Sequence, residues 1–402
     1  MAKHTVLFKA PPMAPEILIP PAGQPHTRAS ARRTHARQAS VFVASALSAT
    51  FAMSATAFMA FRHAPVTPVL PVAVTASTVA ANGDMNPYGV AFVPTRFPAG
   101  GILDAGDLLV SDFANKEGKV GLGVSLVRIR PTGQQSTFFQ GIGVGLTAGL
   151  KVLRAGFVLV ASLPTLDGTT ATVQQGSLLV IDKNGSQVTS IADPELLDGP
   201  RDLTVLDRGQ TVVVFVSNVL SGTVTRLVLT VTQTAIGQTV TASNLTRIAS
   251  GYVHRLGPGV PVIGPSGLAY DPRHDVLFVA STGDNTIFRV ANAGTTIADN
   301  GKGMVLFNDP VHLRGPLGLV FGPNGHLLAT NGGGVLADPN NAGGVVEFTD
   351  RGQFVSQQAV DSKSGGGTGL HFTRDDTGVL RLAWINDHGN TVTIVKFPPP
   401  DW

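Results

Sequence analysis

The sequence predicts an all-β fold, a six-bladed β-propeller, and two observations predict it. A turn containing Gly and leading into an apolar strand recurs at intervals of roughly 45 to 60 residues, the range typical of propeller blades. Clear copies begin at Asn86, Gly264, Gly315 and Gly367, and weaker copies lie at 147–150 and 199–203. The composition agrees, because 47 Gly, 27 Pro and only 14% charged residues suit many short strands joined by tight turns.

The blades follow one another from about residue 86 onward. They are predicted at about 86–140, 146–193, 199–250, 264–309, 315–361 and from 367 on. Their second strands are apolar runs at 107–112, 157–162, 211–216, 276–280, 326–330 and 379–384, and their third strands lie at 125–129, 176–181, 222–227, 286–290, 344–348 and 391–395. Runs of this length bounded by Gly, Asn and Asp are typical of buried strands.

The sixth blade lacks an outer strand of its own, and a strand-like run from Val69 to Thr78 precedes the first blade without a partner. An unclosed ring would leave unpaired backbone groups at a sheet edge, which closure removes. We therefore expect this run to pair with Thr391–Phe397 and to close the ring.

The N-terminal part of the chain lies outside the repeat. Residues 1–39 are rich in Pro, Ala and Arg without an apolar period, and a disordered basic tail is expected there. The segment 40–61 carries no charge and follows four Arg residues; at about 22 residues it is long enough to cross a bilayer as a helix. This layout is typical of a signal peptide or of an N-terminal anchor. Its Ala, Ser and Thr content favours cleavage and its length favours an anchor, so both stay open.

The predicted organisation is therefore a tail, a signal or anchor segment, a Pro-rich linker and a propeller, at 1–39, 40–62, 63–71 and 72–402. The net charge of +3 is concentrated at the N-terminus, since residues 1–63 hold seven Lys or Arg and one acid. The remaining chain is slightly acidic and lacks the basic face that nucleic-acid binding needs. With no Cys, disulfides, thiolate zinc sites and cysteine nucleophiles are excluded.

The run Val279–Val290 resembles an NHL repeat, in which a strand ends at a small or acidic residue, turns at Gly-Asn and continues as an Ile-x-x-Val strand. Residues 385–392 resemble it too. The resemblance covers about 69–397 and implies a six-bladed propeller of bacterial, exported type. It implies little about function, because propellers host many unrelated functions.

Candidate ligand-binding residues come from two positions that face the axis in propellers, the lead into the first strand and the end of the second. The residues chosen are Tyr88, Asp112, Arg201, Asn218, Asn285, Asn331 and Asp387. A polar ring of this kind could hydrogen-bond a ligand. Asn, Asp, Ser and Thr also favour strand ends because they bond local backbone, and the two interpretations are compatible.

The signals for a metal or a catalytic site are weak. Lactonases resembling senescence marker protein place a Glu, an Asn and an Asp on a divalent cation near the axis, and peptide-amidating lyases place His ligands there, but the positions leading into the first strands hold neither a carboxylate nor a His. A three-His set of His254, His312 and His371 is less favoured than structural roles. No cofactor and no metal site are predicted.

The sequence thus favours an exported, periplasmic or membrane-anchored propeller that acts as a binding or scaffold module. It would offer a central cleft or a rim to a small molecule or to an envelope protein, as a monomer and without binding nucleic acid. The membrane contact would run through 40–61 if that segment is not cleaved. The alternative is a metal-dependent hydrolase or lyase with a cation at the propeller axis.

Overall fold

The computed structural model describes residues 71–397 apart from 236, 258–259, 333–342 and 361–364. The predicted tail, the signal or anchor segment and the linker up to residue 70 lie outside the described residues. Within the described part of the chain, no helix is both long enough and apolar enough to span a membrane.

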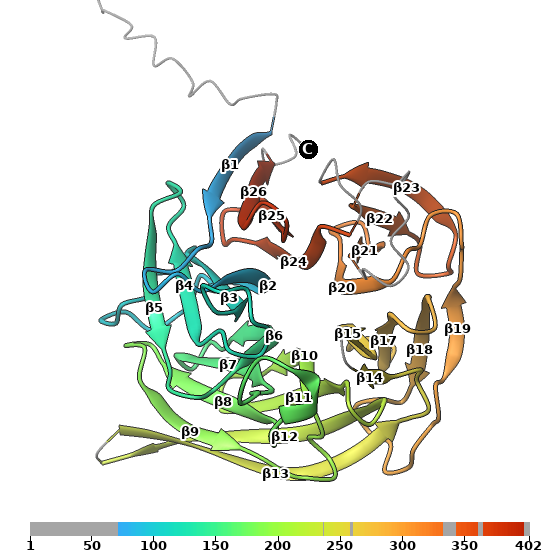
Figure 1. Cartoon of the computed structure of the whole chain (residues 1–402), viewed down its shortest axis with the longest axis horizontal. Coiled ribbons are helices and arrows are strands. Elements are labelled where there is room, and N and C mark those ends of the chain that lie inside the picture. Colours follow the sequence, from blue (N-terminus) through green and yellow to red (C-terminus); the bar gives the residue numbers. More distant parts are fainter. Residues whose placement is uncertain (1–70, 236, 258–259, 333–342, 361–364, 398–402) are drawn as a thin grey trace, which may run out of the picture. The chain divides into compact units, whose positions relative to one another are not determined.

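The described residues form six four-stranded antiparallel sheets arranged radially around one axis (Figure 1). Blade 1 holds β2 (Met85–Phe92), β3 (Leu108–Ala114), β4 (Ser125–Ile129) and β5 (Gln135–Gln140). Blade 2 holds β6 (Leu146–Val152), β7 (Phe157–Ser162), β8 (Ser177–Asp182) and β9 (Gln187–Ile191). Blade 3 holds β10 (Pro200–Asp207), β11 (Thr211–Asn218), β12 (Thr223–Thr234) and β13 (Gly237–Ala249).

Blade 4 holds β16 (Pro265–Asp271), β17 (Val276–Ser281), β18 (Thr286–Ala291) and β19 (Met304–Phe307). Blade 5 holds β20 (Pro316–Phe321), β21 (Leu327–Asn331), β22 (Gly344–Phe348) and β23 (Phe354–Ala359). Blade 6 holds β24 (Gly367–Arg374), β25 (Leu380–Asn386) and β26 (Thr391–Phe397), with β1 (Val72–Ser77) as its outer strand. The predicted all-β, six-bladed architecture is therefore confirmed.

The ring closes where the N-terminal strand joins the last blade. Strand β1 runs antiparallel to β26, with Val72 opposite Lys396 and Ser77 opposite Thr391. Consecutive inner strands contact one another around the axis, and β24 contacts β2. The predicted closure by the run before blade 1 is confirmed, and it leaves β26 with a partner on both sides.

The middle strands read as continuous apolar runs because both faces of each blade are covered by its neighbours. All six residues of β7 are buried, and apolar clusters join blade 6 to 1, 1 to 2, 2 to 3, 3 to 4 and 4 to 5. The outer strands pack on one side alone, so β9 and β23 are mostly exposed. Burial by neighbouring blades, at about 25 cal/mol per Å² of apolar surface, is the main stabilising term.

The recurring Gly of the sequence motif lies at a bulge in the inner strand. Each inner strand shifts register there, as between Pro265 and Leu268 in β16. A Cβ on Gly267 would come within 2.2 Å of the Leu317 carbonyl oxygen of the next blade, and one on Gly369 within 2.1 Å of the Tyr88 carbonyl oxygen. At Gly267 and Gly369 neighbouring inner strands thus approach too closely for a side chain.

Two features between the blades were not expected from the sequence. A short hairpin of β14 (Arg255–Gly257) and β15 (Val260–Ile263) connects blades 3 and 4. It contacts the 3₁₀ turn η1 (Thr170–Thr172), which belongs to the long connection between β7 and β8. Strands β12 and β13 are 12 and 13 residues long and extend past the rest of their blade.

Candidate functional site

The starts of the inner strands and the ends of the second strands lie on one face of the ring. Pro87 is paired with Asp112, Pro200 with Asn218, and Pro316 with Asn331. The two residue sets singled out from the sequence therefore do meet at the same end of the axis. The structure then separates them into groups with different surroundings.

Tyr88 and Arg201 are in direct contact at the mouth of the axis. The Arg201 guanidinium donates from Nε and Nη2 to the Tyr88 hydroxyl at 3.0 and 2.5 Å, and its Cζ lies 4.7 Å from the centre of the Tyr88 ring. It also donates to Ser266 Oγ at 3.3 Å and to the Val262 carbonyl at 2.9 Å. One side chain thereby joins blades 1, 3 and 4 to the β14–β15 hairpin.

Arg201 is 8% exposed, and all four of these bonds go to uncharged acceptors. No carboxylate among the described residues lies within ion-pair distance of its guanidinium. A guanidinium has five N–H donors, so one hydrogen on Nη1 and one on Nη2 remain beyond the bonds described. Burial raises the pKa of the Tyr88 hydroxyl, an effect that the positive charge of Arg201 opposes.

Asp202 takes the place in blade 3 that a Gly holds in the other five blades. Its neighbour Leu203 pairs with Val216, as Val90 pairs with Val110 and Leu268 with Val279. Its carboxylate accepts from the Leu203 amide at 2.7 Å and from the Leu268 amide of the next blade. Among the six equivalent positions of the inner strands, the one in blade 3 is thus the only one with a side chain. The carboxylate of Asp202 lies beside the axis.

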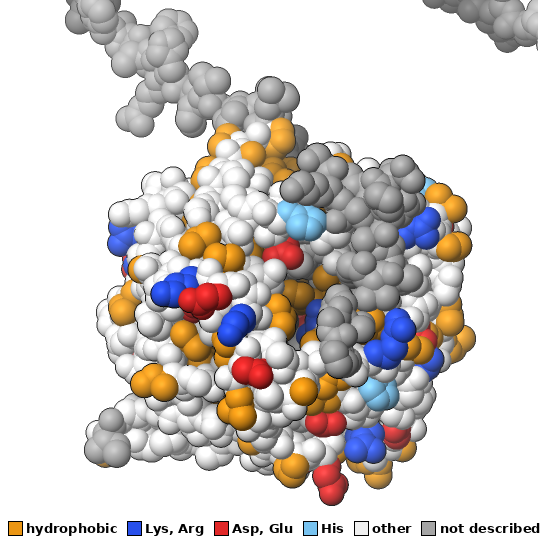
Figure 2. Space-filling model, viewed as in Figure 1, with side chains coloured by type: hydrophobic (Ala, Val, Ile, Leu, Met, Phe, Trp, Pro, Cys, Tyr) orange, Lys and Arg blue, Asp and Glu red, His pale blue; other side chains and the backbone are white. Residues whose placement is uncertain are grey.

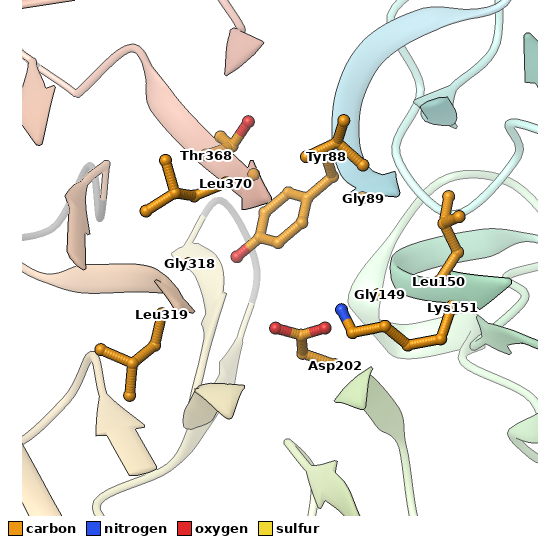
Figure 3. Close-up of a pocket in the computed structure, with 12 residues that line it drawn as sticks. Tyr88, Gly89, Gly149, Leu150, Lys151, Asp202, Gly318, Leu319, Thr368 and Leu370 are labelled. Carbon is orange, nitrogen blue, oxygen red and sulfur yellow. The ribbon is translucent and has the colours of Figure 1, made fainter. Parts of the chain in front are cut away.

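Lys151 brings a second charge to the same place. Figure 3 shows its amine and the Asp202 carboxylate directed toward each other, with the Tyr88 ring beside them. The cavity lined by these groups has a volume of ≈ 20 Å³, about the room that one ordered water needs. The axis is therefore filled at this level, and a ligand larger than water has room only at the mouth.

Burial dominates the titration of the axial groups. It lowers the pKa of the Lys151 amine and raises the pKa of the Asp202 carboxyl, and the attraction between the two charges opposes both shifts. His371 lies nearby on β24, where burial and the charge of Lys151 lower its pKa to about 3. Its Nδ1 accepts from the Phe92 amide at 3.3 Å, so the ring is neutral at neutral pH.

The three candidate Asn residues hold connecting loops by their amide groups. Asn218 donates to the Leu196 carbonyl at 3.0 Å. Asn331 accepts from the Arg314 amide at 2.9 Å and donates to the His312 carbonyl at 2.5 Å, and Asn285 bonds the next loop in the same way. These bonds reach backbone groups 17 to 30 residues away rather than the local backbone that turn chemistry involves, and a ligand role for these residues stays a prediction.

The two candidate Asp residues differ from each other. Asp387 accepts from the Asn86 side chain at 2.6 Å and so ties the last blade to the start of β2. Asp112 is fully buried, and neither of its carboxylate oxygens has a hydrogen-bond partner in the described part of the chain. Burial, together with the nearby charge of Asp84, raises the pKa of Asp112 to about 9.

The three His residues considered together in the sequence lie in different surroundings. His254 contacts the Tyr252 carbonyl at 3.0 Å, His312 stacks on Phe354 with ring centres 3.7 Å apart, and His371 packs against Phe92. Among the described residues, no group of three or more His, Cys, Asp or Glu side chains is placed to hold a metal ion.

Sequence reasoning missed Lys151, Asp202 and Asp84. The first two had a signal: Lys151 is a charged residue in an otherwise apolar inner strand, and Asp202 replaces the recurring Gly. Nothing in the sequence indicated that Lys151 and Asp202 lie close together, because that depends on the twist and spacing of two blades.

On the face shown in Figure 2, Lys and Arg side chains are interspersed with Asp and Glu, without a patch of one sign.

No protein-family model matches the sequence, and a search of curated proteins finds no match. Solved structures resemble it in fold. Regucalcin from Agrobacterium tumefaciens, described as a calcium-binding protein, is 16% identical, with 81% of this chain and 96% of that chain covered and a TM-score of 0.49. A gluconolactonase from Xanthomonas campestris is 16% identical, with 84% and 99% covered and a TM-score of 0.48. Virginiamycin B lyase from Staphylococcus aureus is 13% identical, with 82% and 100% covered and a TM-score of 0.45. At these identities the likeness concerns the fold alone.

Proposed function

We propose that this protein is an exported propeller that works as a binding module, and that the mouth of its axis takes the anionic group of a small molecule or of a protein segment. The observation that carries this proposal is Arg201. It is a nearly buried cation whose bonds in the described structure go to neutral acceptors alone. A buried charge of this kind is stabilised when a partner of opposite charge pairs with it.

The surroundings of Arg201 favour a carboxylate over a larger anion. Tyr88 and Ser266 hold the guanidinium from one side, which fixes its plane. A planar fork with fixed orientation suits bidentate recognition of a carboxylate. The filled axis below limits the ligand to the mouth, so the rest of the ligand would rest on the loops of this face.

Titration of the purified protein with small mono- and dicarboxylates, followed by calorimetry, tests the proposal. Arg201→Gln removes the charge but keeps hydrogen-bonding groups, and we expect it to weaken binding at least about tenfold, since a hydrogen bond to a charged group contributes about 1.5–3 kcal/mol. Arg289→Gln on the exposed side of blade 4 is the matched control, because it removes the same charge away from the axis. Carboxylate binding that is unchanged in Arg201→Gln would refute the proposal.

The export proposal depends on residues 40–61 and their flanking Arg residues. Cleavage would leave a free periplasmic or extracytoplasmic propeller, and retention would leave it anchored to the inner membrane. Mass spectrometry of the protein isolated from its own cells identifies its N-terminal residue and so distinguishes cleavage from retention. A chain recovered from the cytoplasm with its N-terminus intact would contradict export.

The alternative function, a metal-dependent hydrolase or lyase, would use Asp202 as its axial carboxylate. Asp202 is at the right place, but its oxygens already accept two backbone amides and face the Lys151 amine. Metal analysis of the purified protein tests this alternative. A stoichiometric divalent ion that disappears in Asp202→Asn would support it over the binding module.

A further inference from the structure

Two buried carboxylates of blade 1, whose charges act on each other, have no basic partner among the described residues. Asp84, in the turn before β2, is 4% exposed, and Asp112, at the end of β3, is fully buried. Neither forms an ion pair with a described residue. Lys116 passes close to Gly83 with its stem, but its ammonium is exposed and lies 3.8 Å from Glu117. Two buried like charges are unfavourable until something neutralises them.

Asp112 differs from the residues at the same place in other blades. It pairs with Pro87 as Asn218 pairs with Pro200 and Asn331 with Pro316. The two Asn amides donate to loop carbonyls. Both oxygens of Asp112, by contrast, lack a hydrogen-bond partner among the described residues.

Asp84 Oδ2 accepts from the Val124 amide at 2.9 Å, and oxygen-bearing side chains lie beside it. Ser125 lies opposite Asp112 in the continuation of the β3–β4 pairing, and its hydroxyl donates to Asp84 Oδ2 at 2.7 Å. The same hydroxyl lies 3.2 Å from Asn82 Oδ1, which also accepts from the Asp84 amide at 3.1 Å. The Asp84 carboxylate, an amide oxygen and a hydroxyl thus meet at one turn, and Asp112 lies opposite Ser125 in the sheet. Hard cations prefer such ligands.

We propose that Asp84 and Asp112 bind a divalent cation of the calcium type, with Asn82 and Ser125 as further oxygen ligands. A divalent cation would neutralise both carboxylates at once. Ca²⁺ fits better than Mg²⁺, because its coordination geometry is flexible, whereas Mg²⁺ requires a near-ideal octahedron. The cation would fix the turn that precedes β2. Because Tyr88 is in β2, the cation would thereby stabilise the blade 1 side of the axial mouth.

The proposal is tested on the full-length protein stripped with EDTA and dialysed into metal-free buffer. Thermal unfolding is followed with added CaCl₂, MgCl₂ or NaCl at equal ionic strength. For Ca²⁺ at about 100 times its Kd we expect the midpoint to rise by about 5 °C. Elemental analysis should find about one calcium per chain.

Asp112→Asn should abolish the calcium response while the protein stays folded, because Asn is the residue at this place in blades 3 and 5. Asp84→Asn repeats the test from the other carboxylate if Asp112→Asn does not fold. The control Asp376→Asn changes an exposed carboxylate in blade 6 and should respond as the wild type does.

Three results would overturn the proposal. A wild-type midpoint that changes with pH but not with Ca²⁺ means that the pair is neutralised by a proton alone. An equal response in Asp112→Asn and the wild type places the cation elsewhere. Loss of the response in Asp202→Asn with retention in Asp112→Asn assigns the cation to the axis, and thereby to the alternative function.

Discussion

Replacing Tyr88 by Phe removes one hydroxyl from the axial mouth and leaves the ring in place. That hydroxyl accepts two N–H groups of Arg201, at 3.0 and 2.5 Å, and lies 3.3 Å from Ser266 Oγ. The Phe ring would keep the edge contact with Phe113 and the cation–π contact with the guanidinium. The substitution therefore isolates the polar contribution.

The expected cost is about 3 kcal/mol of the free energy of unfolding. Bonds to a charged donor contribute about 1.5–3 kcal/mol each, and a buried charged donor left unsatisfied adds to the loss. Tyr252→Phe is the matched control, because Tyr252 is 1% exposed and its hydroxyl donates a single bond, to the Lys302 carbonyl at 3.2 Å. A neutral bond of this kind contributes about 1 kcal/mol.

Urea unfolding, followed by tryptophan fluorescence, measures both variants. Tyr88→Phe should lower the midpoint clearly more than Tyr252→Phe does, with similar m values. Its carboxylate affinity should be kept or raised, since the freed N–H groups of Arg201 become available to a ligand. Equal losses of stability in the two variants would refute the idea that Arg201 depends on Tyr88 as its acceptor.

Three further results are expected. Gly267→Ala should cost at least about 3 kcal/mol by chemical denaturation because its Cβ would come within 2.2 Å of the Leu317 oxygen, whereas Gly389→Ala, with its nearest atom at 3.3 Å, should cost under about 1 kcal/mol; similar costs would contradict the close approach of the blades. Deletion of residues 69–80 removes β1 and exposes the edge of β26, so folded monomer should be lost on size-exclusion chromatography, and a stable monomeric product would disprove the closure. In metal-free buffer the free energy of unfolding should fall from pH 6 to pH 9 by up to about 1.4 kcal/mol per unit. Burial raises the folded pKa of Asp112 to about 9, so the folded state keeps a proton that the unfolded state has released. The stabilisation is therefore present in full at low pH and is lost as the pH rises toward 9; a slope that persists in Asp112→Asn would assign it to another group.

Several local features could be predicted from the sequence because they depend on neighbours in the chain. The apolar runs of the middle strands, the Gly turns and their spacing were enough to predict the blades and the closure by β1. The hairpin β14–β15 was not predicted, because its strands are 3 and 4 residues long and carry no distinct period. The polar residues at the strand ends were predicted, but the groups to which they form hydrogen bonds were not.

In the candidate site, the repeat predicts which residues are equivalent but not which groups they contact. Tyr88 and Arg201 were chosen from their places in the repeat, and they are 113 residues apart in the chain. Asp112 and Asn218 occupy equivalent places in the repeat, yet one carboxylate lacks a partner in the described structure and the other side chain bonds a loop. The Asn218 amide donates to a loop carbonyl, whereas a carboxyl group stands in the same place of blade 1.

The sequence by itself determined the number of blades and the order of their strands, because hydrophobic period and turn residues act over a few positions. Only the tertiary structure decided that Arg201 lies on Tyr88, that Lys151 faces Asp202, and that Asp84 and Asp112 are buried together. Those pairings follow from the distance and twist between neighbouring sheets, and no local pattern of residues encodes them.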